Sequence, residues 1–384
     1  DYANGGIDPL WVTDEKSELQ HVCGISNDQI WFRYPLRGDF EVQLEAQDGK
    51  WGDPAILANG LRFAAKGQSK AVDVDSQQNR DWVHFSTETV QPGKWNRHII
   101  RFQGESVTYF LNDTPIYQEP RDSAIPWIAM HSSGRKTSTF RNIRIAGTPQ
   151  IAREVVLLSD DALRGWNAFY FYQPLPTANI SKKAREPKGK EGQSYRSAPK
   201  PNQLGQLAWS LKAGELISGT TKRQNATGPL GQSVIRYDRP LGEGETLTYE
   251  FFFEAGKTAV HPSIGRTAYM LHPEGLKRHW MTEVGGRWKL PKDYEAPLDK
   301  ENPQKLPLKE GAWNRVSLQL NKSHQLEIRL NDEIVFDQEI EVLPQGTIFG
   351  LFHYADRTAA RVRNIKLTGP WPAALPEELF TRSE

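Results

Sequence analysis

Cysteine is almost absent from the 384-residue sequence, where Cys23 is the only one. A single thiol excludes an intrachain disulfide and any metal cluster that is held by several thiolates. An excess of one charge is missing too, since 48 Lys and Arg face 47 Asp and Glu. A net charge of +1 provides no field for gathering nucleic acid or an anionic membrane surface.

Long apolar runs and helical patterns are also missing. No stretch approaches the roughly 18 apolar residues that a membrane span needs, and the segment 1–4 lacks the features of a signal peptide. In their place stand 31 Gly, 25 Pro and 40 aromatic residues, counted as 12 Trp, 12 Tyr and 16 Phe. Many turns and large apolar side chains predict an all-β protein, and the length favours two domains.

A long internal repeat organises the chain. The segment 92–97, which ends in Trp-Asn-Arg, leads to Leu-Asn-Asp at 111–113, and the segments 310–315 and 330–332 repeat this order. Alternating apolar residues in 313–320 predict a strand with one buried face. Each Asn-Asp pair then predicts the tight turn of a β-hairpin.

The ends of the two copies match without a gap. His131 and Arg135 precede Arg-Asn-Ile-Arg-Ile at 141–145, and His353 and Arg357 precede Arg-Asn-Ile-Lys-Leu at 363–367. The copies therefore run at least over 11–147 and 209–369.

These limits predict a first module at 1–150, a second at 151–372 and a C-terminal tail at 373–384. Residues 173–205, rich in Pro, Lys, Gly and Ser, are expected to form an exposed excursion of the second module. No segment before Trp11 corresponds to 155–166, so we expect the natural polypeptide to extend upstream of Asp1.

The order of these motifs resembles the concanavalin A-like lectin/glucanase superfamily. Residues 140–145 look like the closing strand, and 158–166 like the opening strand, of 3-keto-disaccharide hydrolase-like domains. Residues 256–262 and 349–357 are similar to uncharacterised planctomycete proteins with a domain of unknown function. The resemblance implies an all-β fold of two tandem concanavalin A-like (jelly-roll) β-sandwiches, and it implies little about chemistry, because this fold hosts many functions.

The repeated His-x-x-x-Arg is the main candidate for a site. A neutral imidazole can act as a base, and a guanidinium can clamp an anion with two hydrogen bonds. Alternatively, the same pair anchors the loop before the last strand through backbone hydrogen bonds. Polar and aromatic side chains suited to sugar binding accompany it; the candidates in the first module are His131, Arg135, Trp51, Arg62, Trp82 and His84, and those in the second are His353, Arg357, Arg266, Tyr269, His279, Trp280, Glu283 and Tyr354.

Carboxylates give weaker signals. Glu250 and Glu254 would share the outward face of a strand, which favours a solvated surface over a catalytic pair. Asp73 and Asp75 with Asp81 offer oxygen ligands to calcium, although no established metal-binding motif is present and we expect neither a metal nor another cofactor.

The sequence supports three alternative hypotheses about function. The first is an extracytoplasmic carbohydrate-recognition protein, periplasmic, secreted or on the cell surface, that binds oligo- or polysaccharides. The second is a glycoside-cleaving hydrolase or lyase acting on oxidised sugars such as 3-keto sugars, with His353 or His279 as the base and Arg357 or Arg266 stabilising negative charge. The third is a structural surface-assembly protein whose sandwiches only pack against partners. Under each hypothesis we expect the chain to be part of a longer polypeptide.

Overall fold

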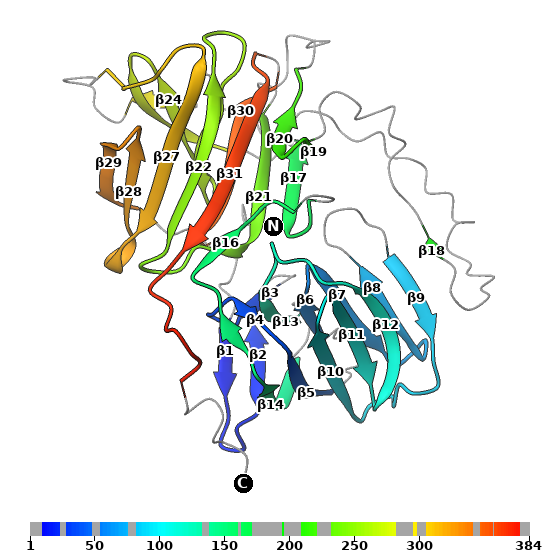
Figure 1. The fold of residues 1–384 in the computed structure, drawn as a ribbon. Coiled ribbons are helices and arrows are strands. Elements are labelled where there is room, and N and C mark those ends of the chain that lie inside the picture. The colour runs from blue at the N-terminus through cyan, green and yellow to red at the C-terminus, as the bar shows by residue number, and fades with distance from the viewer. Residues whose placement is uncertain are drawn as a thin grey trace. The chain divides into compact units, whose positions relative to one another are not determined.

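The computed structural model describes residues 10–23, 28–47, 54–75, 82–132, 138–159, 163–170, 194–195, 209–220, 232–281, 295–297, 305–340, 346–355 and 357–376 (Figure 1). Within these ranges the structure is β throughout, apart from the 3₁₀ turn η3 (Lys322–His324). No helix of the described chain is long and apolar enough to cross a membrane.

The chain divides into two compact units. Unit 1 runs to Val155, and it also includes residues 194–195 and the described segment that begins at Trp371; unit 2 begins at Val156 and ends at Pro370. The C-terminal segment belongs to unit 1 because its apolar side chains pack there. Leu375 lies in the unit 1 core, and the ring of Trp371 lies 5.8 Å from that of Trp127.

Unit 1 is a pair of antiparallel sheets. The first, here called the β5 sheet, has the order β1 (Leu10–Thr13), β2 (Leu19–Cys23), β14 (Thr139–Gly147), β5 (Phe40–Gln47), β10 (Trp95–Gln103), β11 (Ser106–Leu111) and β12 (Thr114–Pro120). The second, the β7 sheet, has the order β18 (Ser194–Tyr195), β9 (Trp82–Ser86), β8 (Ala71–Asp75), β7 (Leu61–Lys66), β6 (Ala55–Ala58), β13 (Ile128–Ser132) and β3 (Asp28–Trp31). A small sheet joins β15 (Gln150–Ile151) to β4 (Leu36–Arg37).

Unit 2 repeats this arrangement. Its β22 sheet has the order β19 (Ser210–Lys212), β20 (Glu215–Ser218), β31 (Ala360–Thr368), β22 (Thr246–Phe253), β27 (Ala312–Leu320), β28 (Gln325–Leu330) and β29 (Glu333–Glu339), and β16 (Glu154–Val156) also pairs with β31. Its β24 sheet has the order β17 (Trp166–Tyr170), β21 (Gln232–Pro240), β30 (Ile348–Tyr354), β23 (His261–Ile264), β24 (Thr267–His272), β25 (Gly275–Trp280) and β26 (Glu295–Pro297). The prediction of two tandem β-sandwiches is confirmed.

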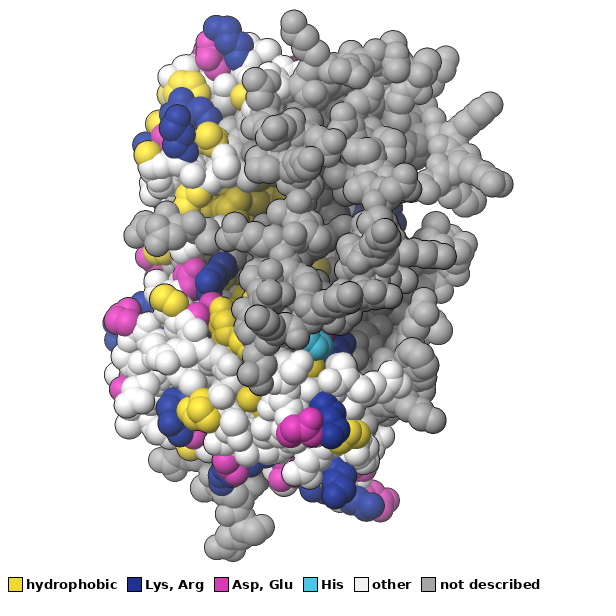
Figure 2. All heavy atoms as spheres, turned by 90° about the vertical axis from the view of Figure 1, so that its right-hand side faces the viewer, with side chains coloured by type: hydrophobic (Ala, Val, Ile, Leu, Met, Phe, Trp, Pro, Cys, Tyr) yellow, Lys and Arg dark blue, Asp and Glu magenta, His cyan; other side chains and the backbone are white. Residues whose placement is uncertain are grey.

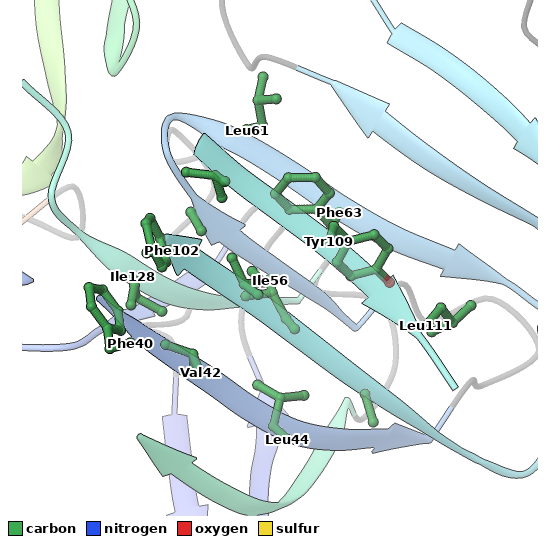
Figure 3. Packing of buried hydrophobic residues seen from close by; sticks show 14 of the residues in the cluster. Phe40, Val42, Leu44, Ile56, Leu61, Phe63, Phe102, Tyr109, Leu111 and Ile128 are labelled. Atoms are coloured by element: carbon green, nitrogen blue, oxygen red, sulfur yellow. The ribbon is translucent and has the colours of Figure 1, made fainter. Parts of the chain in front are cut away.

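The inward faces of each pair of sheets form the cores. In unit 1 the alternate residues Phe40, Val42 and Leu44 of β5 meet Ile56 and Phe63 of the opposite sheet (Figure 3). Alternation along each strand therefore sends the remaining side chains to the outer faces. For the β7 sheet, this rule decides which residues are available for a site.

The repeated Trp-Asn-Arg motif has a structural role. Asn96 is buried, and its Oδ1 accepts hydrogen bonds from the backbone amide five residues earlier at 2.8 Å and from Asn112 Nδ2 at 2.9 Å. Asn314 repeats both bonds, the second with Asn331, at 2.8 Å each. Asn112 and Asn331 also begin the predicted hairpin turns, with positive φ angles of 46° and 48°.

The repeated Arg-Asn-Ile motif is structural as well. The Arg141 guanidinium lies 4.0 Å over the ring of Trp95 in unit 1, and Arg363 lies 4.0 Å over Trp313 in unit 2. The asparagine that follows each arginine has a φ of 54°, where a bulge interrupts the strand pairing. Both motifs thus preserve the sandwich rather than a binding site.

Candidate functional site

The two candidate histidines, His131 and His353, do not occupy equivalent places. Ile128 of β13 pairs with the last residue of β6, and Phe349 of β30 pairs with the last residue of the matching strand β23. Counting three residues onward makes His131 equivalent to Phe352, whereas His353 is equivalent to Ser132. The gapless sequence match predicts matching places for the two histidines, and this prediction is wrong, since a shift of one residue turns a side chain to the opposite face of the sheet.

His353 lies between the sheets of unit 2 and is fully buried. Its ring nitrogens lie 2.8 Å from the carbonyl oxygen of Thr358 and 3.0 Å from Ser218 Oγ, so Nδ1–H donates to the carbonyl while Nε2 accepts from the hydroxyl. Burial lowers the pKa of His353 to about 4, which keeps the imidazole neutral. The contact with Thr358 is the loop-anchoring hydrogen bond of the alternative interpretation.

Unit 1 has a buried histidine in the same region, but from another strand. His21 of β2 aligns with Ser218 of β20, because Phe140 pairs with Leu19 as its counterpart Val362 pairs with Leu216. His21 Nε2 lies 2.9 Å from an oxygen of Asp28, and both residues are buried. Each sandwich therefore holds a buried histidine on one of these two facing strands, and unit 1 holds a second interior histidine, His98 of β10, whose Nδ1 lies 2.8 Å from the hydroxyl oxygen of Tyr109.

The outer face of the β7 sheet carries an ion pair and a carboxylate–imidazole pair. Arg62 donates from Nε to both oxygens of Asp75 at 3.2 Å each and from Nη2 to Oδ2 at 2.8 Å. His84 Nδ1 lies 2.8 Å from Asp73 Oδ1. Their side chains are 14–22% exposed, which leaves all four residues reachable from solvent. We call these four residues the unit 1 polar cluster.

Strand pairing explains why the cluster forms. Phe63 and Val74 pair and face the core, so their neighbours Arg62, Asp75 and Asp73 point outward. In the register, Asp73 lies between His84 on one side and Ala64 on the other, and Ala55 follows. Both alanines are fully buried, so this part of the outer face is not open to solvent.

The other unit 1 candidates lie as follows. His131 is buried and shares the outward-facing register of Ala55, with which it pairs. Trp82 pairs with Asp75 through its backbone. Trp51 and Arg135 lie outside the described residues. The structure thus joins Arg62 and His84 to two aspartates that sequence reasoning had considered for calcium.

The outer face of the β24 sheet in unit 2 differs strongly. A buried apolar cluster, here called the unit 2 apolar cluster, covers it and consists of Val234, Ala268, Met270, Met281, Phe352 and Tyr354. His279 is buried beside it, with its ring 5.1 Å from that of Phe352 and its Nδ1 3.4 Å from the hydroxyl oxygen of Tyr354. The Arg357 guanidinium lies 4.5 Å over the ring of Tyr354.

Two more histidines, missed by sequence reasoning, lie at this face. His261 pairs with Phe352, and its ring lies 5.6 Å from that of His272. His261 Nδ1 accepts a hydrogen bond from the backbone amide of Leu271 at 3.0 Å. Burial, reinforced by His272 and the other nearby histidines, lowers the pKa of His261 well below its usual value. These imidazoles belong to a desolvated layer.

The remaining unit 2 candidates are dispersed. Tyr269 points into the core, where its ring lies 4.9 Å from that of Phe336. Arg266 is half-buried at the hairpin turn after β23, and Trp280, at the end of β25, is 45% exposed. Glu283 lies outside the described residues. Of the four residues named in the enzyme hypothesis, His279 and Arg357 thus meet around Tyr354, Arg266 lies at the hairpin turn, and His353 lies on the other side of the sheet.

The carboxylate candidates have cationic partners. Glu250 accepts from Arg363 Nε at 2.6 Å, and Glu254 lies 2.5 Å from Lys257 Nζ. Asp73 and Asp75 are the partners of His84 and Arg62, and Asp81 lies outside the described residues. No group of three metal-binding side chains occurs among the residues described.

The polar cluster left a signal in the sequence. Asp73 and Asp75 alternate with Val72 and Val74, a pattern typical of a half-buried strand. The charged residue types on both flanking strands, Arg62 and His84, would complete the pairs once the strand order is known. Without that order, the partners could not be assigned.

Two family models match parts of the chain. A domain of unknown function, DUF1583_N, matches residues 227–374, and a protein of unknown function, DUF1581, matches residues 99–196. Each covers less than half of the sequence. No curated protein matches the chain.

Several solved structures are similar to a single sandwich. The carbohydrate-binding module CBM66 from Bacillus subtilis is 13% identical, with 37% of this chain and 94% of that chain covered and a TM-score of 0.30. Sheep galectin-11, in complex with glycerol, is 15% identical over 32% of this chain and 98% of its own, with a TM-score of 0.25. The exoplasmic/lumenal domain of VIP36, in its Ca²⁺/Man3GlcNAc-bound form, is 12% identical over 44% of this chain and 86% of its own, with a TM-score of 0.28.

Proposed function

We propose that unit 1 binds carbohydrate at the outer face of its β7 sheet. The observation that carries the proposal is the unit 1 polar cluster, in which an ion pair and a carboxylate–imidazole pair lie on three adjacent strands and remain partly exposed. Sugar recognition needs several polar groups held in fixed positions, because each hydroxyl both donates and accepts hydrogen bonds. Ion-paired carboxylates are oriented in advance, so binding orders fewer side chains.

Each member of the cluster has a role in this proposal. A carboxylate that accepts bonds from one cation keeps further lone pairs for sugar hydroxyls. Asp73 holds the His84 ring through Nδ1 and thereby fixes the direction of the other ring nitrogen.

Unit 2 supports recognition less well. Its corresponding face bears buried aromatic, methionine and imidazole groups, which offer few polar atoms to a hydroxylated ligand. We therefore assign binding to unit 1 alone, rather than to both modules. We also propose that binding takes place outside the cytoplasm, where extracellular polysaccharides are found.

Affinity electrophoresis through gels that contain neutral polysaccharides tests the proposal. The wild-type protein should be retarded by at least one of pullulan, galactomannan and galactan, and Asp73→Asn should weaken that retardation about tenfold, because it removes a charged acceptor. Glu45→Gln is the matched control, since Glu45 pairs with Arg141 on the other sheet of unit 1. No retardation by any polysaccharide, or equal losses in both variants, would contradict the proposal.

A further inference from the structure

We infer that the Arg62–Asp75 ion pair is a specificity determinant that excludes acidic sugars from the proposed site. This inference rests on the proposed function and names the ligand class, namely neutral polysaccharides. Its basis is the geometry of one guanidinium. Arg62 directs Nε and Nη2 at Asp75 through three contacts of 3.2, 3.2 and 2.8 Å.

Asp75 occupies one of the two guanidinium edges that can recognise an acid. A guanidinium binds a carboxylate through two parallel N–H groups, and the Nε and Nη2 groups of Arg62 already point to Asp75. A uronate would have to displace that carboxylate or approach the remaining Nη1 edge beside it, where the Asp75 charge offsets that of the guanidinium. A neutral hydroxyl needs only one donor or one acceptor, and the pair still provides both.

The charges near the Arg62–Asp75 pair also disfavour an acidic ligand. Asp73 and Asp75 point to the same face two residues apart, which is about 7 Å along a strand. The cluster has two carboxylates, one guanidinium and one imidazole that adds at most one positive charge, so it carries no net positive charge. A ligand carboxylate would therefore gain no net attraction and would meet Asp73 and Asp75 at short range, where salt screens incompletely.

The other arginines of unit 1 provide a contrast. Arg141 contacts Glu45 through Nε at 2.6 Å, with side-chain exposures of 35% and 25%. That pair lies on the β5 sheet and packs against Trp95, away from the polar cluster. Freeing Arg141 changes the protein charge by the same amount as freeing Arg62, so it separates a local effect from a global one.

The experiment compares each neutral polymer with its acidic derivative. Pullulan, galactomannan and galactan are cast into gels, each beside the same polymer after oxidation of its primary hydroxyls to carboxylates. Wild-type protein should bind the neutral form at least about tenfold more tightly than the oxidised form. Asp75→Asn should raise affinity for the oxidised form about tenfold or more, because the Arg62 edge becomes available.

Two further variants complete the design. Asp75→Asn combined with Arg62→Gln should lose the gained affinity, and Glu45→Gln should gain none. Equal or tighter binding of the oxidised polymer by the wild type would overturn the inference, as would equal gains in Asp75→Asn and Glu45→Gln. Absence of wild-type binding to every neutral polymer would instead contradict the proposed function. The wild-type comparison decides the question even if Asp75→Asn fails to fold.

Discussion

The outer faces of the β7 and β24 sheets share one strand plan and differ in their chemistry. In unit 1 this face bears a partly exposed polar cluster beside the buried residues Ala55, Ala64 and His131, and in unit 2 it bears a buried layer of aromatic, methionine and imidazole groups. On the view in Figure 2, described Lys and Arg side chains lie beside Asp and Glu, in keeping with a net charge of +1. The comparison teaches that duplication preserved the scaffold, while the outer faces changed separately.

The interior shows the same separation on a smaller scale. Unit 1 places His21 on β2 opposite a serine of β13, and unit 2 places His353 on β30 opposite Ser218 of β20. The two residue types have exchanged strands while one buried imidazole remained. A fixed requirement for a buried hydrogen bond at this place explains the exchange better than a shared ligand would.

The largest expected effect tests whether the unit 2 face is structural. Phe352 is fully buried in the unit 2 apolar cluster. Phe352→Ala should lower the free energy of unfolding by about 3–5 kcal/mol, measured by denaturant titration, while polysaccharide binding below the transition is unchanged. The control Ile334→Ala, at a side chain that is 46% exposed, should change it by about 0.5 kcal/mol or less. A stable Phe352→Ala protein that no longer binds sugar would reverse the assignment of the two faces.

A smaller effect concerns pH and the interior histidine of unit 2. The folded pKa of His353 is about 4 against an ordinary value of 6.5, so the unfolded chain binds the proton more tightly. Stability from this group is complete above about pH 6.5 and is lost as the pH falls towards 4. At pH 5 the loss should be about 2 kcal/mol relative to pH 7.

His353→Gln isolates that contribution, because the other histidines remain. Its free energy of unfolding should vary less with pH between 7 and 5 than that of the wild type, by about the same 2 kcal/mol. If the free energies of unfolding of the two proteins changed equally between pH 7 and pH 5, the contribution assigned to His353 would be contradicted.

The smallest expected effect is on stability, and it tests whether Arg62 of the unit 1 polar cluster has a structural role. Arg62→Gln breaks an ion pair whose side chains are 22% and 14% exposed. Because solvent screens such a pair, the free energy of unfolding should fall by about 1 kcal/mol or less in a denaturant titration. A loss as large as that of Phe352→Ala would make Arg62 a structural residue rather than a binding one.

Much of the scaffold was predictable because its signals are local. The hairpins at Asn112 and Asn331 follow from turn chemistry, and alternation marks strands such as 313–320. Pairing across the chain was not predictable. Residues 194–195 were expected in an excursion of the second module, yet they pair with β9 of unit 1. The segment from Trp371 likewise contributes Leu375 to the unit 1 core.

The site was predicted only in part, for a physical reason. Arg62 and His84 were among the predicted site residues. The repeated histidines, however, lie on opposite faces of their sheets, because His131 points outward and His353 points into the core. β13 and β30 are buried on both faces, so their sequences lack the alternation that would have revealed the one-residue shift. The motif match across 131–145 and 353–367 correctly aligns the last strands of the two units. It does not determine which side chains of the preceding strands, β13 and β30, face the core.

Hydrogen–deuterium exchange with and without the retained neutral oligosaccharide tests the central claim most directly. The account predicts slower exchange of backbone amides in β7, β8 and β9 of unit 1, and unchanged exchange in β23, β24 and β25 of unit 2. Protection confined to the unit 2 strands, with unit 1 unaffected, would contradict it.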